Sequence, residues 1–179
     1  GVCPECRKMQ KLIHPDLHFV FPVVKSAKMK TPISDEYINE WRNLLLENPY
    51  IDLEEWLGAM GADENAQALI YTEESGNILR KLNLKSFESE YKVMIIWLPE
   101  KMKTECSNKL LKILEEPYPN TLFLLVAEHA EEIINTILSR TQRINIPPLT
   151  QKDITEQLMQ QKRLVRESAE EVAHVASGS

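Results

Sequence analysis

Apolar residues gather in three segments that favour β-strands. Residues 17–24 alternate in polarity and are rich in β-forming side chains. Residues 93–98, after Lys92, are a continuous apolar run, which is typical of a central parallel strand buried on both faces of a sheet. A second apolar run at 122–126 is also expected to be a buried strand, and a short further strand is expected at 142–146.

Helical periodicity fills the intervals between these strands. The pattern predicts helices over residues 35–47, 52–60, 73–84, 104–116 and 130–138. Ser34 is placed to cap the first helix, and Pro117 and Pro119 end the fourth because proline has no backbone N–H to donate. Cys106 lies on the apolar stripe of the fourth helix and is expected to be a small core residue. Alternating strands and helices indicate an α/β domain with a mostly parallel sheet.

A double proline at 147–148 marks the predicted end of this domain, which then covers residues 1–147. Thr150 and Asp153 have the spacing of a capping box, which opens a helix. Two amphipathic helices are expected after the double proline, at 150–162 and 166–176. Residues 148–179 are therefore interpreted as the start of a helical lid domain.

Two stretches of the first domain follow no clear pattern. Residues 25–30 form a basic loop that is expected to be solvated, with contact to phosphate as the alternative. Residues 48–72 are the least regular part of the chain and include Gly58 and Gly61. They are interpreted as an insertion with no assigned chemistry.

Composition sets limits on the class of protein. The chain has 179 residues, of which 43% are hydrophobic, enough for one substantial core. Its net charge of −6 argues against a uniformly basic nucleic-acid-binding face. No apolar run approaches the roughly 20 residues of a membrane helix, and three cysteines favour a reducing compartment over a disulfide framework. Because the chain starts at Gly1, we expect it to be part of a longer protein.

The only motif typical of metal binding is Cys3-Pro4-Glu5-Cys6, a C-x2-C spacing that presents two thiolates to one zinc ion. Tetrahedral zinc needs about four ligands. His14 and His18 have an i, i+4 spacing, but Pro15 between them breaks a shared helical face. Two interpretations stay open: half of a zinc site whose other ligands precede Gly1, or a pair of free thiols.

Five ordered blocks of residues resemble the clamp-loader subunits of bacterial DNA polymerase III, a branch of the AAA+ ATPases. The central block is N-x-L-L-K-x-L-E-E-P, and the five blocks lie at 92–96, 101–102, 108–117, 121–125 and 137–140. The resemblance implies an AAA+ type P-loop NTPase domain with a mostly parallel sheet. Its phosphate-binding loop would lie before Gly1, because the chain contains no G-x-x-x-x-G-K-[ST] motif.

The resemblance also implies that this chain does not hydrolyse ATP. Relatives that hydrolyse ATP carry an acidic pair after the central strand to hold magnesium, whereas this chain has Trp97-Leu98-Pro99. Glu100 is the nearest acid and lies beyond the proline. The polar sensor residue of the family falls at Ala127. No magnesium site is therefore expected.

Arg140 is the one residue to which the resemblance assigns chemistry. The family's Ser-Arg-Cys motif supplies an arginine finger to ATP on the adjacent subunit, and here it reads Ser139-Arg140-Thr141. Ser139 supports the motif, and Glu115, Glu116 and Thr141 are candidate subunit contacts. The alternative is that Arg140 is an ordinary surface arginine or a partner in a salt bridge.

Together these features resemble the delta-prime type of subunit, a non-hydrolysing stator. The implied partners are the gamma/tau and delta subunits, and through the complex the sliding clamp and primed DNA, in the bacterial cytoplasm. DNA polymerase activity would belong to the holoenzyme, with this chain itself not catalytic. Two alternatives remain: an active gamma/tau ATPase of the same loader, and a non-catalytic zinc-bearing interaction domain.

Overall fold

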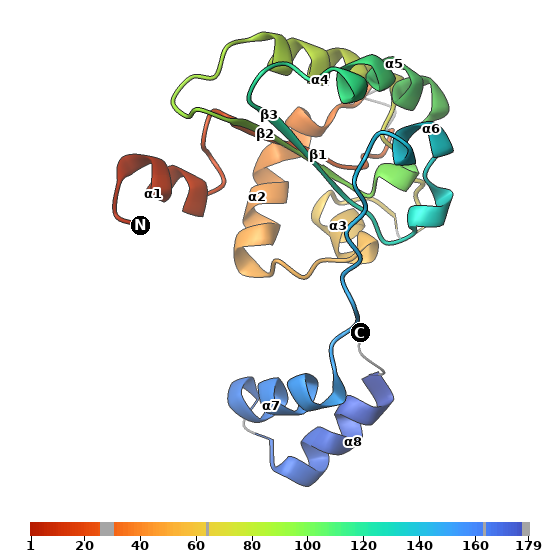
Figure 1. Ribbon diagram of the computed structural model, residues 1–179. Coiled ribbons are helices and arrows are strands. Elements are labelled where there is room, and N and C mark those ends of the chain that lie inside the picture. The colour runs from red at the N-terminus through yellow and green to blue at the C-terminus, as the bar shows by residue number, and fades with distance from the viewer. Residues whose placement is uncertain (26–30, 64, 163, 177–179) are drawn as a thin grey trace. The chain divides into compact units, whose positions relative to one another are not determined.

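The computed structural model describes residues 1–25, 31–63, 65–162 and 164–176 (Figure 1). The chain divides into two compact units, Gly1–Gln142 and Arg143–Ser179, and each is described by itself. In the described residues no helix is both long and apolar enough to cross a membrane.

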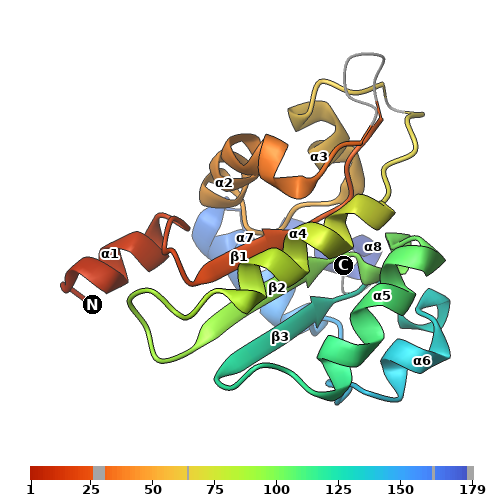
Figure 2. The same ribbon diagram turned by 90° about the horizontal axis from the view of Figure 1, so that it is seen from above.

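A parallel sheet of three strands organises the first unit. Figure 2 shows β1 (Leu17–Val20), β2 (Lys92–Trp97) and β3 (Thr121–Val126) side by side in that order. In the register, Leu17 lies opposite Val93, and Val93 lies opposite Leu122. The expected α/β fold with a parallel sheet is therefore confirmed, although β1 ends at Val20. Pro22 has no N–H for the ladder, and Val23 forms an isolated antiparallel bridge with Leu69 instead.

Helices occupy most of the connections where the periodicity predicts them, and α1 is a further helix that was not predicted. In chain order they are α1 (Pro4–Gln10), η1 (Ser34–Tyr37), α2 (Ile38–Glu47), α3 (Leu53–Ala59), α4 (Thr72–Asn83), η2 (Pro99–Lys101), α5 (Thr104–Glu115), η3 (Ala130–Glu132) and α6 (Asn135–Leu138). The single helix predicted at 130–138 is wrong, because Ile133 and Ile134 adopt extended backbone ψ angles and separate η3 from α6. Residues branched at Cβ lose side-chain freedom in a helix, which favours a break there.

One face of the sheet packs against α4 and α5. The buried cluster on this face combines Met94 and Ile96 of β2 with Ile78 and Leu82 of α4, and Leu110 of α5. Cys106 belongs to the same cluster and is fully buried, as predicted, and burial raises the pKa of its thiol to about 12. A cysteine in this environment behaves as a small apolar residue.

The other face carries an aromatic cluster beneath α2 and α3. Trp41 stacks on Phe21 with ring centroids 4.3 Å apart and also contacts Trp97 of β2. The Nε1 of Trp56 donates to the carbonyl of Pro22 at 2.7 Å. The 48–72 stretch, which carries Trp56 within α3, thus supplies part of the core and is not merely a surface excursion.

The expectation that the run at 122–126 is buried is wrong for three of its five side chains. Phe123 and Leu125 pack against the α4 and α5 side, whereas Leu122, Leu124 and Val126 are 47%, 42% and 50% exposed. The aromatic cluster draws its strand residues from β1 and β2, and α2 and α3 lie on the β1 side of the sheet (Figure 2). One face of β3 is therefore left uncovered.

The strand predicted at 142–146 is also absent from the described structure. Ile144 and Ile146 are 79% and 89% exposed, and no neighbouring strand pairs with these residues. Composition alone does not make a strand, because the backbone needs a ladder partner.

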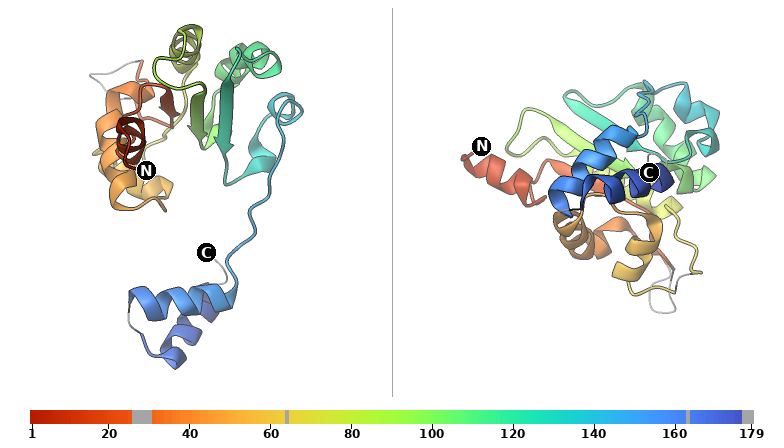
Figure 3. Two further views of the ribbon diagram at one scale, coloured as in Figure 1. Left: turned by 60° about the vertical axis from the view of Figure 1, so that its left-hand side comes forward. Right: turned by 90° about the horizontal axis from the view of Figure 1, so that it is seen from below.

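The second unit contains two helices, α7 (Gln151–Gln161) and α8 (Arg166–Ala176), which pack together (Figure 3). Ile154 of α7 and the small residues Ala169 and Ala173 of α8 are all buried. The predicted capping box is present: the N–H of Asp153 donates to Thr150 Oγ1, and the N–H of Thr150 donates to Asp153 Oδ2.

Candidate functional site

The end of the central strand carries buried side chains without a carboxylate. Trp97, Leu98 and Pro99 are all buried, and Leu98 adopts the left-handed conformation with φ 52°. Its N–H donates to the carbonyl of Val126 at 2.8 Å, which fixes the turn to β3. None of these three side chains carries an oxygen atom.

Glu100, the nearest acid, is used by the chain itself. Its Oε1 accepts the backbone N–H groups of Glu128 at 3.0 Å and His129 at 3.1 Å. Its Oε2 is buried and has no partner in the described residues. Glu100 therefore orders the turn that follows β3, next to the half-buried Ala127.

Arg140 lies just after α6 and folds back over the last turn of that helix. Its backbone N–H donates to the carbonyl of Ile137 at 3.0 Å, and Ile137 is 1% exposed, which anchors the turn. Nη1 donates to the carbonyl of Thr136 at 2.7 Å and to Ser139 Oγ at 3.3 Å. Ser139 thus contacts the guanidinium directly, as a supporting residue would.

A carboxylate from a different helix completes this site. Arg140 Nη2 forms an ion pair with Oε1 of Glu115, the last residue of α5. Glu116, the next residue, is exposed. Thr141 Oγ1 donates to the α6 carbonyls of Ile137 and Leu138, each at 3.2 Å. Of the three candidate contact residues, only Glu115 is brought to Arg140.

The Arg140 side chain is partly accessible. It is 27% exposed, compared with 49% for Glu115, while its Nε is buried without a partner in the described residues. A guanidinium presents five N–H donors, so part of its donor capacity remains for an oxygen outside the chain. The ion pair is also what an ordinary structural arginine would show.

Cys3 and Cys6 lie at the start of α1 and not in an open turn. Cys3 is the N-cap, and its Sγ accepts the N–H of Cys6 at 3.4 Å. Both thiols are free, and hydrogen bonding with Cys6 raises the pKa of Cys3. Among the described residues, no group of three or more His, Cys, Asp or Glu side chains is placed to hold a metal. Two thiols would supply half of the four ligands of a tetrahedral zinc site.

Neither histidine joins the cysteines. His14 is buried, its Nδ1 accepts the N–H of Asp16 at 3.2 Å, and its Nε2 lies 3.8 Å from Glu88 Oε2. Burial lowers the pKa of His18 to about 4, helped by the charges of Lys81 and Lys92. His18 is therefore neutral at physiological pH, in a half-buried position on β1.

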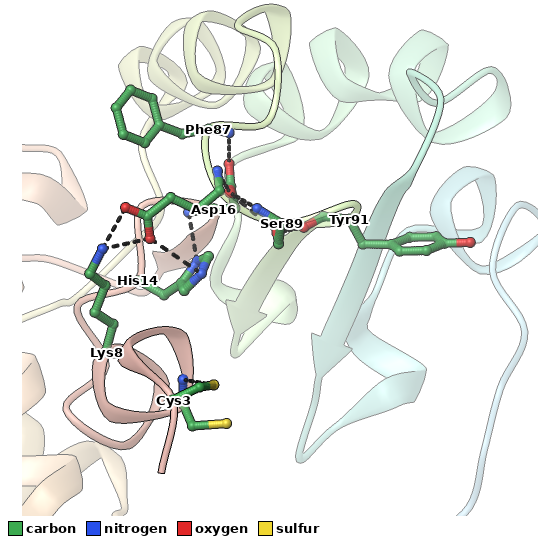
Figure 4. Close-up of polar contacts among 9 residues, drawn as sticks. Cys3, Lys8, His14, Asp16, Phe87, Ser89 and Tyr91 are labelled. Atoms are coloured by element: carbon green, nitrogen blue, oxygen red, sulfur yellow. Dashed lines mark hydrogen bonds and ion pairs between the residues drawn. The ribbon is translucent and has the colours of Figure 1, made fainter. Parts of the chain in front are cut away.

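A buried carboxylate beside His14 was not predicted from the sequence (Figure 4). Asp16 Oδ1 accepts the N–H of Phe87 at 2.6 Å, and Oδ2 accepts the N–H groups of Glu88 at 2.8 Å and Ser89 at 2.9 Å. Burial works against ionisation of Asp16, but these hydrogen bonds outweigh it, so its pKa lies below the usual value. Asp16 thus fastens the loop before β2 to the start of β1.

The same loop is tied to α1, because Lys8 Nζ donates to Glu88 at 2.5 Å and 2.6 Å. Lys92, at the start of β2, is buried and donates to the carbonyls of Lys81, Leu82 and Leu84 at the end of α4. In the sequence, the only sign that Asp16 and Lys92 bind distant backbone groups is that each is a charged residue at the edge of a strand, which is a weak signal.

The basic loop falls mostly outside the described residues, which include Lys25 but not 26–30. Lys25 Nζ lies 4.5 Å from the centre of the Tyr71 ring, and Lys103 Nζ lies 5.4 Å from it. These cation–π contacts engage both lysines within the chain.

The fold and the site define an α/β protein with a parallel sheet, no acidic pair at the end of its central strand and an arginine beyond the last strand. The family model described as DNA polymerase III, delta subunit, matches residues 1–150, and the chain belongs to this family.

Individual proteins agree with this assignment. The chain is 27% identical to DNA polymerase III subunit delta' of Bacillus subtilis over 159 residues, which are 89% of this chain and 35% of that protein. It is 27% identical to subunit delta' of Haemophilus influenzae over 146 residues, covering 82% of this chain and 32% of the relative. The chain therefore spans about a third of the length of these two relatives.

Two further similarities are more limited. The chain is 31% identical to DNA polymerase III subunit gamma/tau of Mycobacterium tuberculosis over 85 residues, covering 46% of this chain and 15% of that protein. A solved DNA polymerase III gamma subunit-related protein from Thermotoga maritima gives a TM-score of 0.46 at 18% identity, covering 97% of this chain and 60% of that one.

Proposed function

We propose that this chain is part of a non-hydrolysing, delta-prime type subunit of a bacterial clamp loader, which supplies Arg140 to ATP bound by the adjacent subunit. The partners would be gamma/tau and delta subunits and, through the complex, a sliding clamp and primed DNA in the cytoplasm. The observation that carries the proposal is the buried Trp97-Leu98-Pro99 turn, which leaves no carboxylate where ATP-hydrolysing relatives hold magnesium.

The position of Arg140 supports the second half of the proposal. Its guanidinium lies at the surface of the first unit, held by α6 and Glu115 and still partly exposed. Developing charge on a transferred phosphoryl group is stabilised by such a group when it comes from a neighbouring protein. Ser139 would hold the guanidinium in place, and Glu116 and Thr141 would lie at the subunit contact.

The proposal predicts that the purified full-length protein alone does not hydrolyse ATP in the presence of magnesium, even with primed DNA. The physical reason is that no metal-binding carboxylate follows β2. The measurement is phosphate release, with the reconstituted clamp loader as the positive control. Steady turnover by the protein alone would instead favour the gamma/tau-like ATPase, to which the similarity over 85 residues points.

We also propose that Cys3 and Cys6 are two of four ligands of a structural zinc ion in the full-length protein. The thiols lie one helical turn apart at the same end of α1, which suits one tetrahedral ion. The full-length protein should contain about one zinc per chain, and the double variant Cys3→Ser/Cys6→Ser should lose it while Cys106→Ala keeps it. Zinc that stays at full occupancy in the double variant would refute this site.

A further inference from the structure

The contact between Arg140 and Glu115 joins two helices that are far apart in the sequence. The two residues are separated by 25 positions, and Glu115 closes α5 while Arg140 follows α6. The end of a helix carries a partial negative charge, so an acidic residue there is unfavourable unless a cation compensates it. Glu115 therefore stands at a position that helix electrostatics disfavours, with Arg140 as its compensating charge.

Most N–H groups of the Arg140 guanidinium already make hydrogen bonds within the chain or are buried. Nη1 donates to Thr136 and Ser139, and Nη2 donates to Glu115. Nε is buried and has no partner in the described residues, so it is not available to a ligand outside the chain. Of the five N–H groups of a guanidinium, the second N–H on Nη2 takes part in none of these contacts. Its direction is set by the bond that the other Nη2 hydrogen makes to Glu115.

Resting on the proposed function, we infer that Glu115 is the positioning residue of the arginine finger. The carboxylate and the Thr136 carbonyl hold the guanidinium plane from two sides, so that the second N–H of Nη2 faces the neighbouring nucleotide before assembly. A free arginine side chain would have to lose rotamer freedom on contact. Half-exposed ion pairs add little to stability, so the role of Glu115 lies in geometry and not in folding.

The test is a double-mutant cycle in the reconstituted clamp loader with full-length subunits. Glu115→Gln keeps the size of the side chain but removes its charge. It is expected to lower the kcat of DNA-stimulated ATP hydrolysis roughly threefold to tenfold, with an unchanged KM for ATP and normal assembly. In the Arg140→Ala background the same change should have no further effect. Glu105→Gln, an exposed glutamate in the first turn of the same helix, is the matched control.

The outcomes separate this inference from the function on which it rests. If Arg140→Ala lowers turnover and Glu115→Gln leaves it unchanged or raises it, Glu115 does not position the finger, and the proposed function stands. Equal losses from Glu115→Gln in the presence and absence of Arg140 would also overturn the inference. If Arg140→Ala itself has no effect, the proposed function fails.

Discussion

Replacement of Arg140 by alanine is expected to lower DNA-stimulated ATP hydrolysis by the reconstituted clamp loader at least about tenfold, and clamp loading with it. Arginine fingers contribute about 10³-fold or more to phosphoryl transfer by stabilising charge on the γ-phosphate. The variant should assemble normally, because the contacts that would be lost are a half-exposed ion pair and two hydrogen bonds at the surface. The measurements are phosphate release at saturating ATP and the fraction of clamp placed on primed DNA.

Two further variants sharpen this experiment. Arg140→Lys keeps the positive charge but loses the planar guanidinium, so it should recover only a small part of the turnover. Arg143→Ala removes an exposed arginine that bonds to Asn145, and it should behave like wild type. Turnover that is the same in Arg140→Ala and wild type would show that Arg140 is an ordinary salt-bridge partner of Glu115.

Replacement of Asp16 by asparagine is expected to destabilise the first unit by about 2–4 kcal/mol, since hydrogen bonds to a buried charged group are among the most valuable. The amide has a single oxygen to accept with, so its NH2 group would face either the N–H of Phe87 or the N–H groups of Glu88 and Ser89, which now donate to the carboxylate. The loop before β2 should open first. Denaturant unfolding measures the loss, and hydrogen exchange at the amides of Phe87, Glu88 and Ser89 locates it.

The stability contributed by Asp16 has a defined dependence on pH. Its pKa is lower in the folded protein than the ordinary value of 3.8, so the contribution is complete above that pH and is lost as the pH falls through the folded pKa. The gap between wild type and Asp16→Asn should therefore shrink in acid. Asp63→Asn, at an exposed position, is the control. Unchanged amide protection of the loop in Asp16→Asn would contradict the assigned role.

Short sequence patterns predicted the structure well wherever a segment's conformation depends only on residues within that segment. The capping box at Thr150 and the two prolines after α5 each act within a few residues, and both predicted the helix boundary to within about two positions. The helix around Trp41 ends as predicted, but it begins at Ile38 and not at residue 35, and Ser34 bonds to Phe21 and Glu74 instead of capping it. Patterns whose outcome depends on another strand or helix packing against the segment were less informative. The strand predicted at 142–146 needed a neighbour to pair with, and the exposure of Leu122 depended on whether a helix covered it.

The residues of the candidate site likewise separate into those that local sequence identifies and those that only packing identifies. Arg140, Ser139 and the absence of acids after β2 were identified from the sequence, because motif residues lie next to one another in the chain. Which of Glu115 and Glu116 meets Arg140 depends on how α5 and α6 pack. The two glutamates are identical in type and adjacent in sequence, so no local signal distinguishes them.

The sequence by itself determined the three strands that pair, most of the helices between them and the family, since these follow from periodicity and short motifs. Only the tertiary structure decided the electrostatic partners: Glu115 for Arg140, the loop amides for Asp16 and the carbonyls of α4 for Lys92. Such pairs form between segments that are distant along the chain, and charged groups leave water only where the fold supplies their partners. Which partner a buried charge finds depends on how the whole molecule packs, so no single segment of the sequence reveals it.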